Sequence, residues 1–164
     1  MNLKLKPNRV VEISVCPVSI DQIEQEQLVI EQALTILTSR LKQRNTAFHN
    51  ASMVRAFLRL QLEPKEREHF AVMFLDAQHR LIEYQVLFIG TIDSTTVSPR
   101  DIIKVALQLN AYSLIVAHNH PSGVATPSEQ DISFTKQLMS ALKVVGIKLL
   151  DHLVVGHDEI VSIS

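Results

Sequence analysis

The stretch SLIVAHNHPSGVATPSEQD, at residues 113–131, decides which fold and which chemistry this chain can have. It opens with the run Ser113 to Ala117, whose almost wholly apolar side chains predict a strand buried on both faces of a sheet. His118 and His120 follow directly at the end of this strand. Because side chains two residues apart in an extended segment point to the same side, both imidazoles can approach one metal ion.

The second half of the stretch supplies a third candidate ligand. Residues 121–123 predict a turn, and Ser128 predicts the N-cap of a helix whose first turn contains Asp131. That helical turn can bring the Asp131 carboxylate back toward the two histidines. Zinc accepts such a set, since catalytic zinc sites use three protein ligands and keep a fourth position for water. The spacing therefore predicts zinc at His118, His120 and Asp131, as in a metal-dependent hydrolase.

Hydrolysis at such a site needs a general base within hydrogen-bond reach of the water on the zinc ion. Glutamate is the usual choice, and Glu68, just ahead of the next apolar run upstream, is the candidate. Glu66 and Glu83 stay open as alternatives. Taken singly, the histidines could be surface residues, the glutamate an exposed charge, and the serine and aspartate a plain helix cap. Their occurrence in this order around an apolar strand favours the metal site.

Other metal-enzyme patterns do not fit the sequence. A zinc deaminase needs a His-x-Glu together with a paired-cysteine motif, which a single cysteine cannot supply, and a helical zincin needs His-Glu-x-x-His, which the chain lacks. A magnesium-dependent nuclease is disfavoured because two histidines and one aspartate lack the acidic cluster that magnesium requires. Asp151 and His152 form a second acid–imidazole pair, which is either structural or supports the metal site from outside its ligand shell.

The overall composition predicts one globular domain with an N-terminal arm. The 164 residues are 46% hydrophobic and 20% charged, and the formal net charge of −1 gives no basic excess for binding nucleic acid. Local basic patches are possible at Lys4, Lys6 and Arg9, and at Arg40, Lys42 and Arg44. The single cysteine, Cys16, excludes an intrachain disulfide and fits a reducing compartment. Since Met1 to Pro7 lack a signal-peptide core and no run suggests a membrane span, we expect a soluble, cytoplasmic protein.

Hydrophobic periodicity predicts an alternation of helices and strands. Helices are expected over residues 21–42, from Asn50 to before Pro64, from Pro99 to about Asn110, and after Ser128; strands are expected at 69–75 and 81–89 (a hairpin), 113–117, 147–155 and 159–163. The credible internal boundary lies near Asn45 to Asn50. We therefore expect an arm at residues 1–46 with an amphipathic helix, and a domain at 47–164.

The pattern His118-x-His120, seven residues that begin with Pro121, then Ser128-x-x-Asp131, with an upstream glutamate, resembles the JAMM motif of MPN-domain metalloproteases. From Ala47 to Ser164 the chain is similar to the RadC family, and most to its short members, which lack a paired helix-hairpin-helix segment. The segments that carry this resemblance are FLD (74–76), FIGTI (88–92), PR (99–100), NA (110–111), AHNHPSG (117–123) and LDHLVVG (150–156).

The resemblance implies an α/β fold of the MPN or cytidine-deaminase-like type, with a mixed, curved sheet flanked by helices behind an N-terminal helical arm. It also implies zinc held by His118, His120 and Asp131. In that scheme Glu68 activates the water, and Ser128 stabilises the tetrahedral oxyanion.

Both lines of argument lead us to expect a zinc-dependent hydrolase of peptide, amide or isopeptide bonds, acting on a protein or peptide. The alternative is a noncatalytic module with a structural zinc, which docks a protein partner or assists DNA repair. Nucleic acid stays possible as a partner, although the net charge does not support it. The sequence leaves the oligomeric state open.

Overall fold

The structure is a computed structural model that describes residues 19–43, 51–90 and 98–163. Along these residues lie α1 (Ile20–Lys42), α2 (Ala51–Leu62), β1 (His69–Leu75), β2 (Leu81–Ile89), α3 (Pro99–Gln108), β3 (Ser113–Asn119), α4 (Glu129–Val144), β4 (Lys148–Val155) and β5 (Ile160–Ser162). The predicted order of helices and strands is confirmed, and both hairpin strands have the predicted bounds. The predicted boundary between residues 46 and 47 lies outside the described residues, as do Lys4, Lys6, Arg9, Cys16 and Arg44.

The strands form one mixed sheet in the order β2-β1-β3-β4-β5. β1 pairs antiparallel with both β2 and β3, whereas β3 and β4 run parallel and β5 returns antiparallel beside β4. The central strand, β3, is buried along its whole length, which confirms the prediction of a strand with two buried faces. The predicted mixed α/β fold class is confirmed as well.

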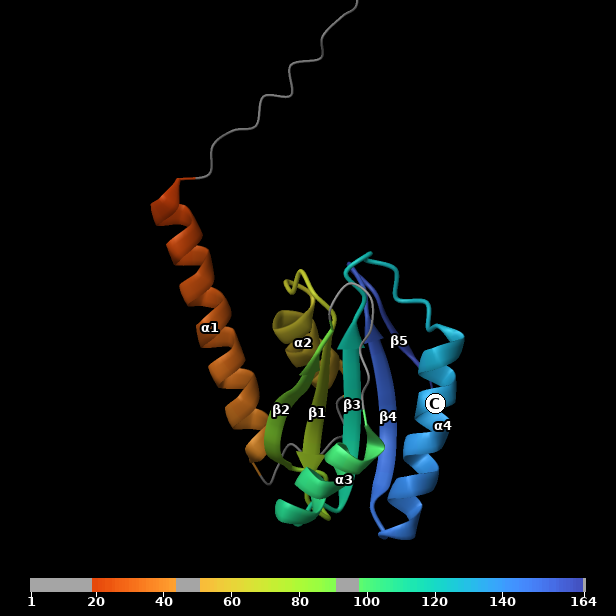
Figure 1. Ribbon diagram of the computed structural model, residues 1–164. Coiled ribbons are helices and arrows are strands. Elements are labelled where there is room, and N and C mark those ends of the chain that lie inside the picture. Colours follow the sequence, from red (N-terminus) through yellow and green to blue (C-terminus); the bar gives the residue numbers. More distant parts are fainter. Residues whose placement is uncertain (1–18, 44–50, 91–97, 164) are drawn as a thin grey trace, which may run out of the picture.

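The sheet separates two apolar cores, and the four helices cover its two faces (Figure 1). On one face, α2 and the C-terminal half of α1 pack against side chains such as Met73 and Ile115. On the other face, α3 and α4 pack against side chains such as Val72 and Val116. The alternation of these residues along β1 and β3 is the period-two pattern that a sheet with two covered faces requires.

Local sequence explains where the helices begin and end. The Ser19 side chain caps α1 by accepting a hydrogen bond from the backbone N–H of Gln22, and Pro99 begins α3. Ser128 caps α4, which ends before Gly146 with its φ of +73°. Within residues 19–43, 51–90 and 98–163, no helix has the combined length and apolar character needed to cross a bilayer.

Leu58 tests the contribution of the α2 core to stability, because its side chain is fully buried between α2 and the sheet. We expect Leu58→Ala to lower the free energy of unfolding by about 2–5 kcal/mol, through lost burial and the cavity left behind. Urea denaturation followed by circular dichroism measures this change. Leu107→Ala, at a side chain that is 56% exposed on α3, is the control and should stay within about 0.5 kcal/mol of the wild type. Equal effects of the two substitutions would contradict the assignment of the core.

Candidate metal centre

His118 and His120 lie at the carboxyl end of β3, and Asp131 faces them from the first turn of α4. The Nε2 atoms of the two histidines are 3.0 Å apart. The Asp131 carboxylate reaches both rings, with Oδ1 3.3 Å from His118 Nε2 and Oδ2 3.6 Å from His120 Nε2. Among the described residues, the structure thus brings the three predicted ligands into one group.

The separations of these atoms fit a tetrahedral metal ion. Zinc–nitrogen and zinc–oxygen bonds of ~2.0–2.1 Å place neighbouring tetrahedral ligand atoms about 3.3 Å apart. The two Nε2 atoms are 3.0 Å apart, and each lies 3.3 or 3.6 Å from a different oxygen of the carboxylate, so the separations are close to that value. The His118 side chain is 1% exposed, whereas those of His120 and Asp131 are 20% and 18% exposed. The three side chains can therefore hold a divalent ion at the protein surface, and one side of that ion would be open to water.

A chain of hydrogen bonds fixes the tautomer of His118. The Thr135 hydroxyl donates to the backbone carbonyl of Asp131 at 2.6 Å, so it can only accept from Nδ1–H of His152, which is 2.6 Å away. Burial, and then the charge on His118, lower the pKa of His152 to about 3, so that ring is neutral and its Nε2 is an acceptor. His118 Nδ1 lies 2.9 Å from that acceptor and must carry the proton. The Nε2 lone pair of a neutral His118 is then directed at the site.

A single hydrogen bond fixes the tautomer of His120. Its Nδ1 lies 2.8 Å from the carbonyl oxygen of Val124, which can only accept, so Nδ1 is protonated. In neutral rings the Nε2 atoms of His118 and His120 thus present two lone pairs to each other at 3.0 Å. Two acceptors at this distance repel unless a cation lies between them. This is the tautomer pair that shared metal ligation requires.

The electrostatics of the site favour a cation. Burial of Asp131 opposes its ionisation, but the hydrogen bonds that His118 and His120 donate when protonated, together with that from Ser128, outweigh it and hold the pKa of the carboxyl far below its usual range. The hydrogen bond with Asp131 raises the pKa of His120 against the opposing effect of burial, and the charge of Glu68 adds a smaller increase. The negative field that stabilises a proton on His120 would also stabilise a metal ion.

Ser128 acts as the cap that the sequence suggested. Its side chain accepts from the Asp131 backbone N–H at 3.2 Å, and its own hydroxyl donates to Asp131 Oδ2 at 2.6 Å. The Ser128 backbone N–H also donates to Oδ2, at 2.8 Å. These three contacts orient the carboxylate toward the histidines.

Glu68 lies at the same end of the sheet as the ligand trio. Phe70 on β1 pairs with His118 on β3 in antiparallel register, so position 68 lies opposite position 120. The negative charge of Glu68 makes a small contribution to the raised pKa of His120. Glu83 is paired with Phe74, toward the opposite end of β1, and its register separates it from the site. Glu66 is an exposed residue of the connection before β1.

Asn119 was given no role from the sequence, yet it holds the segment that carries Glu68. The buried side chain accepts from the His69 backbone N–H at 2.8 Å through Oδ1. Its Nδ2 donates to the carbonyls of Lys65 and Arg67, each at 3.1 Å. These contacts lie on both sides of Glu68. The sequence could not reveal them, because the partners are 50 to 54 residues away in the chain.

The pair Asp151 and His152 divides into two roles. The Asp151 carboxylate accepts from the His152 backbone N–H at 2.8 Å and from the Ser162 hydroxyl at 2.5 Å, which ties β4 to β5. The His152 ring points the other way and contacts His118. Of the two interpretations left open by the sequence, the structural one fits Asp151 and the supporting one fits His152.

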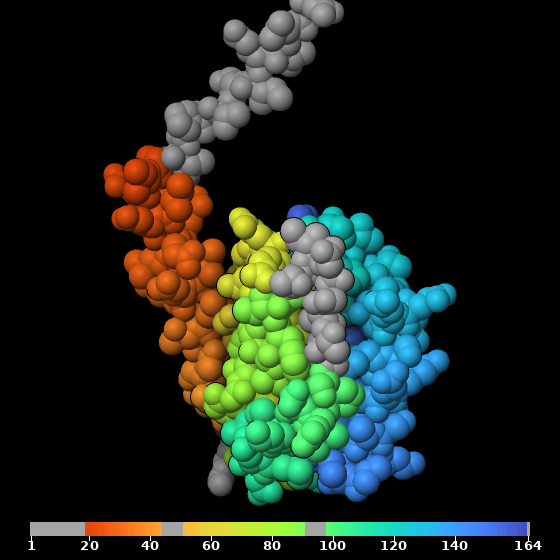
Figure 2. All heavy atoms as spheres, in the orientation of Figure 1, coloured from red at the N-terminus to blue at the C-terminus, as the bar shows by residue number. Residues whose placement is uncertain are grey.

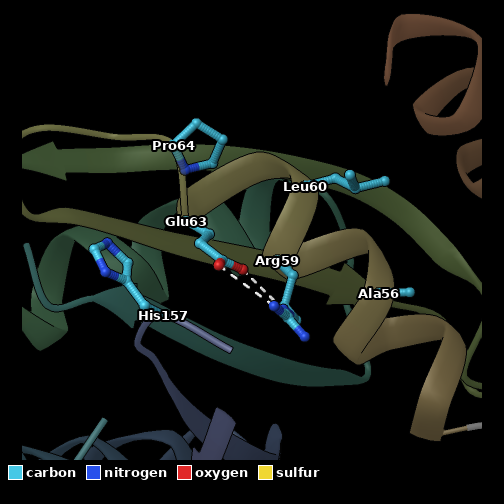
Figure 3. Close-up of a pocket in the computed structure, with 6 residues that line it drawn as sticks. All are labelled: Ala56, Arg59, Leu60, Glu63, Pro64 and His157. Atoms are coloured by element: carbon cyan, nitrogen blue, oxygen red, sulfur yellow. Dashed lines mark hydrogen bonds and ion pairs between the residues drawn. The ribbon is translucent and has the colours of Figure 1, made fainter. Parts of the chain in front are cut away.

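An open pocket adjoins the segment after the second histidine, and Figure 3 shows the side chains that line it: Ala56, Arg59, Leu60, Glu63, Pro64 and His157. Arg59 donates to Glu63 at 2.8 Å and to Asp158 at 3.1 Å. The backbone N–H of His157 donates to the carbonyl of Gly123 at 2.8 Å, which links the pocket to the site. Since these charges pair with one another, the pocket presents a mainly apolar wall.

Comparison with known proteins gives consistent matches. A family model described as a RadC-like JAB domain matches residues 48–164. A UPF0758 protein of Marinomonas is 51% identical over 140 residues, covering 85% of this chain and 62% of that protein. A UPF0758 protein of Leptothrix cholodnii is 51% identical over 138 residues, covering 84% of this chain and 62% of that protein. The UPF0758 protein YkfG of Escherichia coli is 44% identical over 140 residues, covering 85% of this chain and 89% of YkfG.

The extent of these matches differs between the two kinds of comparison. The chain spans about 62% of the length of the Marinomonas and Leptothrix relatives, but most of YkfG. An alignment of 140 residues is longer than residues 48–164, so the similarity to Marinomonas and YkfG reaches into the part of the chain before residue 48. Part of α1 therefore lies within the regions that align with these relatives.

Thr135 tests the hydrogen-bond chain behind His118. Thr135→Val removes the acceptor of His152 Nδ1–H without changing the shape of the side chain, so the tautomer of His118 is no longer enforced. We expect divalent-metal affinity, measured by competition with a chromophoric chelator, to fall roughly 10- to 100-fold.

The matched control is Thr35→Val, since the Thr35 hydroxyl also donates to the carbonyl four residues earlier, but on exposed α1. This variant should bind metal like the wild type. Equal metal affinities for Thr135→Val and Thr35→Val would show that the hydrogen bonds from Thr135 through His152 to His118 do not support metal binding.

Proposed function

The chain belongs to the RadC-like JAB domain family, and we propose that it is a zinc-dependent hydrolase of peptide, amide or isopeptide bonds. The observation that carries this proposal is the convergence of His118, His120 and Asp131 in one group, with hydrogen-bond partners on both Nδ1 atoms that direct the Nε2 atoms to the site. The likeness of the ligand spacing to the JAMM motif of metalloproteases supports the same reaction class.

The donor set favours zinc and a catalytic site over a structural one. Two imidazole nitrogens and one carboxylate oxygen suit zinc, whereas magnesium requires more oxygen ligands in an octahedral arrangement. Structural zinc sites are commonly closed by four protein ligands. The group found among the described residues offers three, with an open side, which leaves a position for water or substrate.

Zinc bound here would supply a nucleophilic water at neutral pH and polarise the scissile carbonyl. Glu68 is proposed as the general base, taking a proton from the attacking water as its oxygen bonds to the carbonyl carbon. The same carboxyl then returns the proton to the leaving nitrogen as the carbon–nitrogen bond breaks. Asn119 would position Glu68 by fixing the backbone on both sides of it.

Ser128 is proposed as the donor to the oxyanion that forms on the substrate carbonyl. Its hydroxyl donates to Asp131 Oδ2 over an Oγ–Oδ2 distance of 2.6 Å, so this role requires the O–H to rotate about the Cβ–Oγ bond toward the substrate. The Ser128 backbone N–H would continue to hold Asp131 during that rotation. The serine can thus serve the substrate without releasing the ligand.

A protein or peptide is the proposed substrate class. The net charge of −1 offers no general attraction to nucleic acid, and the open side of the metal site leaves room for an extended chain. The noncatalytic alternative keeps the same metal but needs no base. Glu68 therefore separates the two functions.

Glu68→Gln should leave metal content unchanged and lower turnover by about 10²- to 10⁴-fold, because the amide cannot accept the proton. Turnover is measured with zinc-loaded protein on a peptide library, followed by mass spectrometry of the products. Glu66→Gln, two residues away on the exposed connection, is the matched control and should retain activity.

Loss of zinc in Glu68→Gln would assign Glu68 to the ligand shell instead. If the wild type cleaves no peptide, and binds DNA in a salt-sensitive way that Glu68→Gln does not alter, the noncatalytic alternative replaces the proposal.

A further inference from the structure

Helix α1 carries two apolar stripes, and within residues 19–43, 51–90 and 98–163 only one of them is packed. Leu34, Leu37 and Leu41 contact the core between α2 and the sheet. Val29 and Ile36 belong to a different face of the helix, and their side chains are 63% and 52% exposed. They are seven residues apart, which is about two helical turns, so they lie on one line along the helix.

The exposed face has the spacing of a helix–helix seam. Glu26, Val29, Ala33, Ile36 and Arg40 follow one another at intervals of three, four, three and four residues. This is the a/d spacing of coiled coils, in which apolar positions pack across the seam and charges select the partner. We call this set of five residues the α1 seam.

The α1 seam is complementary to itself when reversed. If two copies of the helix cross antiparallel at Ala33, Val29 of one copy lies against Ile36 of the other. Glu26 then lies against Arg40 at both ends. A small side chain occupies the centre, where the helices approach most closely. A parallel arrangement would instead set Glu26 against Glu26 and Arg40 against Arg40.

The charge distribution along the whole helix favours the same arrangement. The half of α1 before Gln32 contains Asp21, Glu24, Glu26 and Glu31 and no basic residue, whereas Arg40 and Lys42 lie in the last turn. An antiparallel partner therefore brings an acidic half against a basic end. The dipoles of the two helices also oppose each other in this arrangement.

The position of α1 leaves room for such a partner. Its N-terminal half extends beyond the sheet and α2, away from the body of the domain (Figures 1 and 2). The core contacts begin only at Leu34. A second helix can lie along the α1 seam, with its own domain beyond the far end.

We propose that the α1 seam is a self-association surface, on which a second copy of this chain docks its own α1 antiparallel, with Ala33 at the two-fold axis. The resulting dimer carries two metal centres, one on each side of the paired helices. This inference is independent of the reaction proposed for those centres.

Charge reversal in the full chain tests both the partner and the register. Sedimentation equilibrium should detect a dimer for the wild type. Glu26→Arg and Arg40→Glu should each raise its dissociation constant roughly tenfold or more, since like charges then face each other. The double variant restores opposite charges and should recover the wild-type constant.

The recovery is diagnostic, because residues 26 and 40 of one helix are about 21 Å apart and cannot pair within one copy. Ile36→Lys should abolish the dimer. Val144→Lys, at a side chain that is 86% exposed on α4, is the control and should not change it. Thermal unfolding of each variant verifies that it folds.

A wild type that sediments as a monomer at every concentration would overturn the proposal, whatever else covers the stripe. A dimer that ignores the charge reversals, or that the double variant fails to restore, would overturn the antiparallel register and with it the α1 seam.

Discussion

The antiparallel pairing of β1 with β3 is the constraint on which the rest of the site depends. With Phe70 opposite His118, the residue two positions before Phe70 must lie opposite His120, on the same face of the sheet. A slip of one residue would turn every side chain of a strand to the other face. Burial forbids such a slip, because β1 and β3 are packed from both sides and each face has its own apolar core. The register that stabilises the fold therefore also brings the end of β1, next to Glu68, beside the end of β3 that carries the two histidines.

A second constraint comes from burying two imidazoles side by side. An unpaired donor or acceptor in the interior costs about 1–3 kcal/mol, so His118 and His152 are stable there only if each ring nitrogen is satisfied. The hydrogen bonds through Thr135 satisfy these nitrogens with only one arrangement of protons, because the series ends on a backbone carbonyl that can only accept. That carbonyl belongs to Asp131, itself a candidate ligand. The two candidate ligands His118 and Asp131 are thus connected twice. They contact each other directly at the site, and they are also linked through the hydrogen bonds of His152 and Thr135.

The sequence was sufficient for what depends on near neighbours in the chain. The apolar run before His118, the two-residue spacing of the histidines and the capping serine predicted the strand, the helix and the ligand trio. It was insufficient where contacts depend on strand order. His152 reaches His118 because β4 lies parallel to β3, and Asn119 reaches the segment before β1 because β1 lies on the other side. Periodicity likewise predicted one apolar stripe on α1, whereas separating the packed from the exposed apolar residues required the packed domain.

The helix cap shows why a structural and a functional explanation of Ser128 need not compete. In the capping box, the Ser128 backbone N–H and hydroxyl both contact Asp131 Oδ2, at 2.8 and 2.6 Å. This leaves Oδ1 directed at His118, 3.3 Å away. The contacts that begin α4 therefore also hold the carboxylate in the orientation that the proposed ligand role requires. Because the helix must form for the domain to fold, the conformational entropy of the carboxylate is lost on folding and not on ion binding. A preorganised ligand raises metal affinity, so the cap would strengthen the binding of an ion proposed for this solvent-open trio.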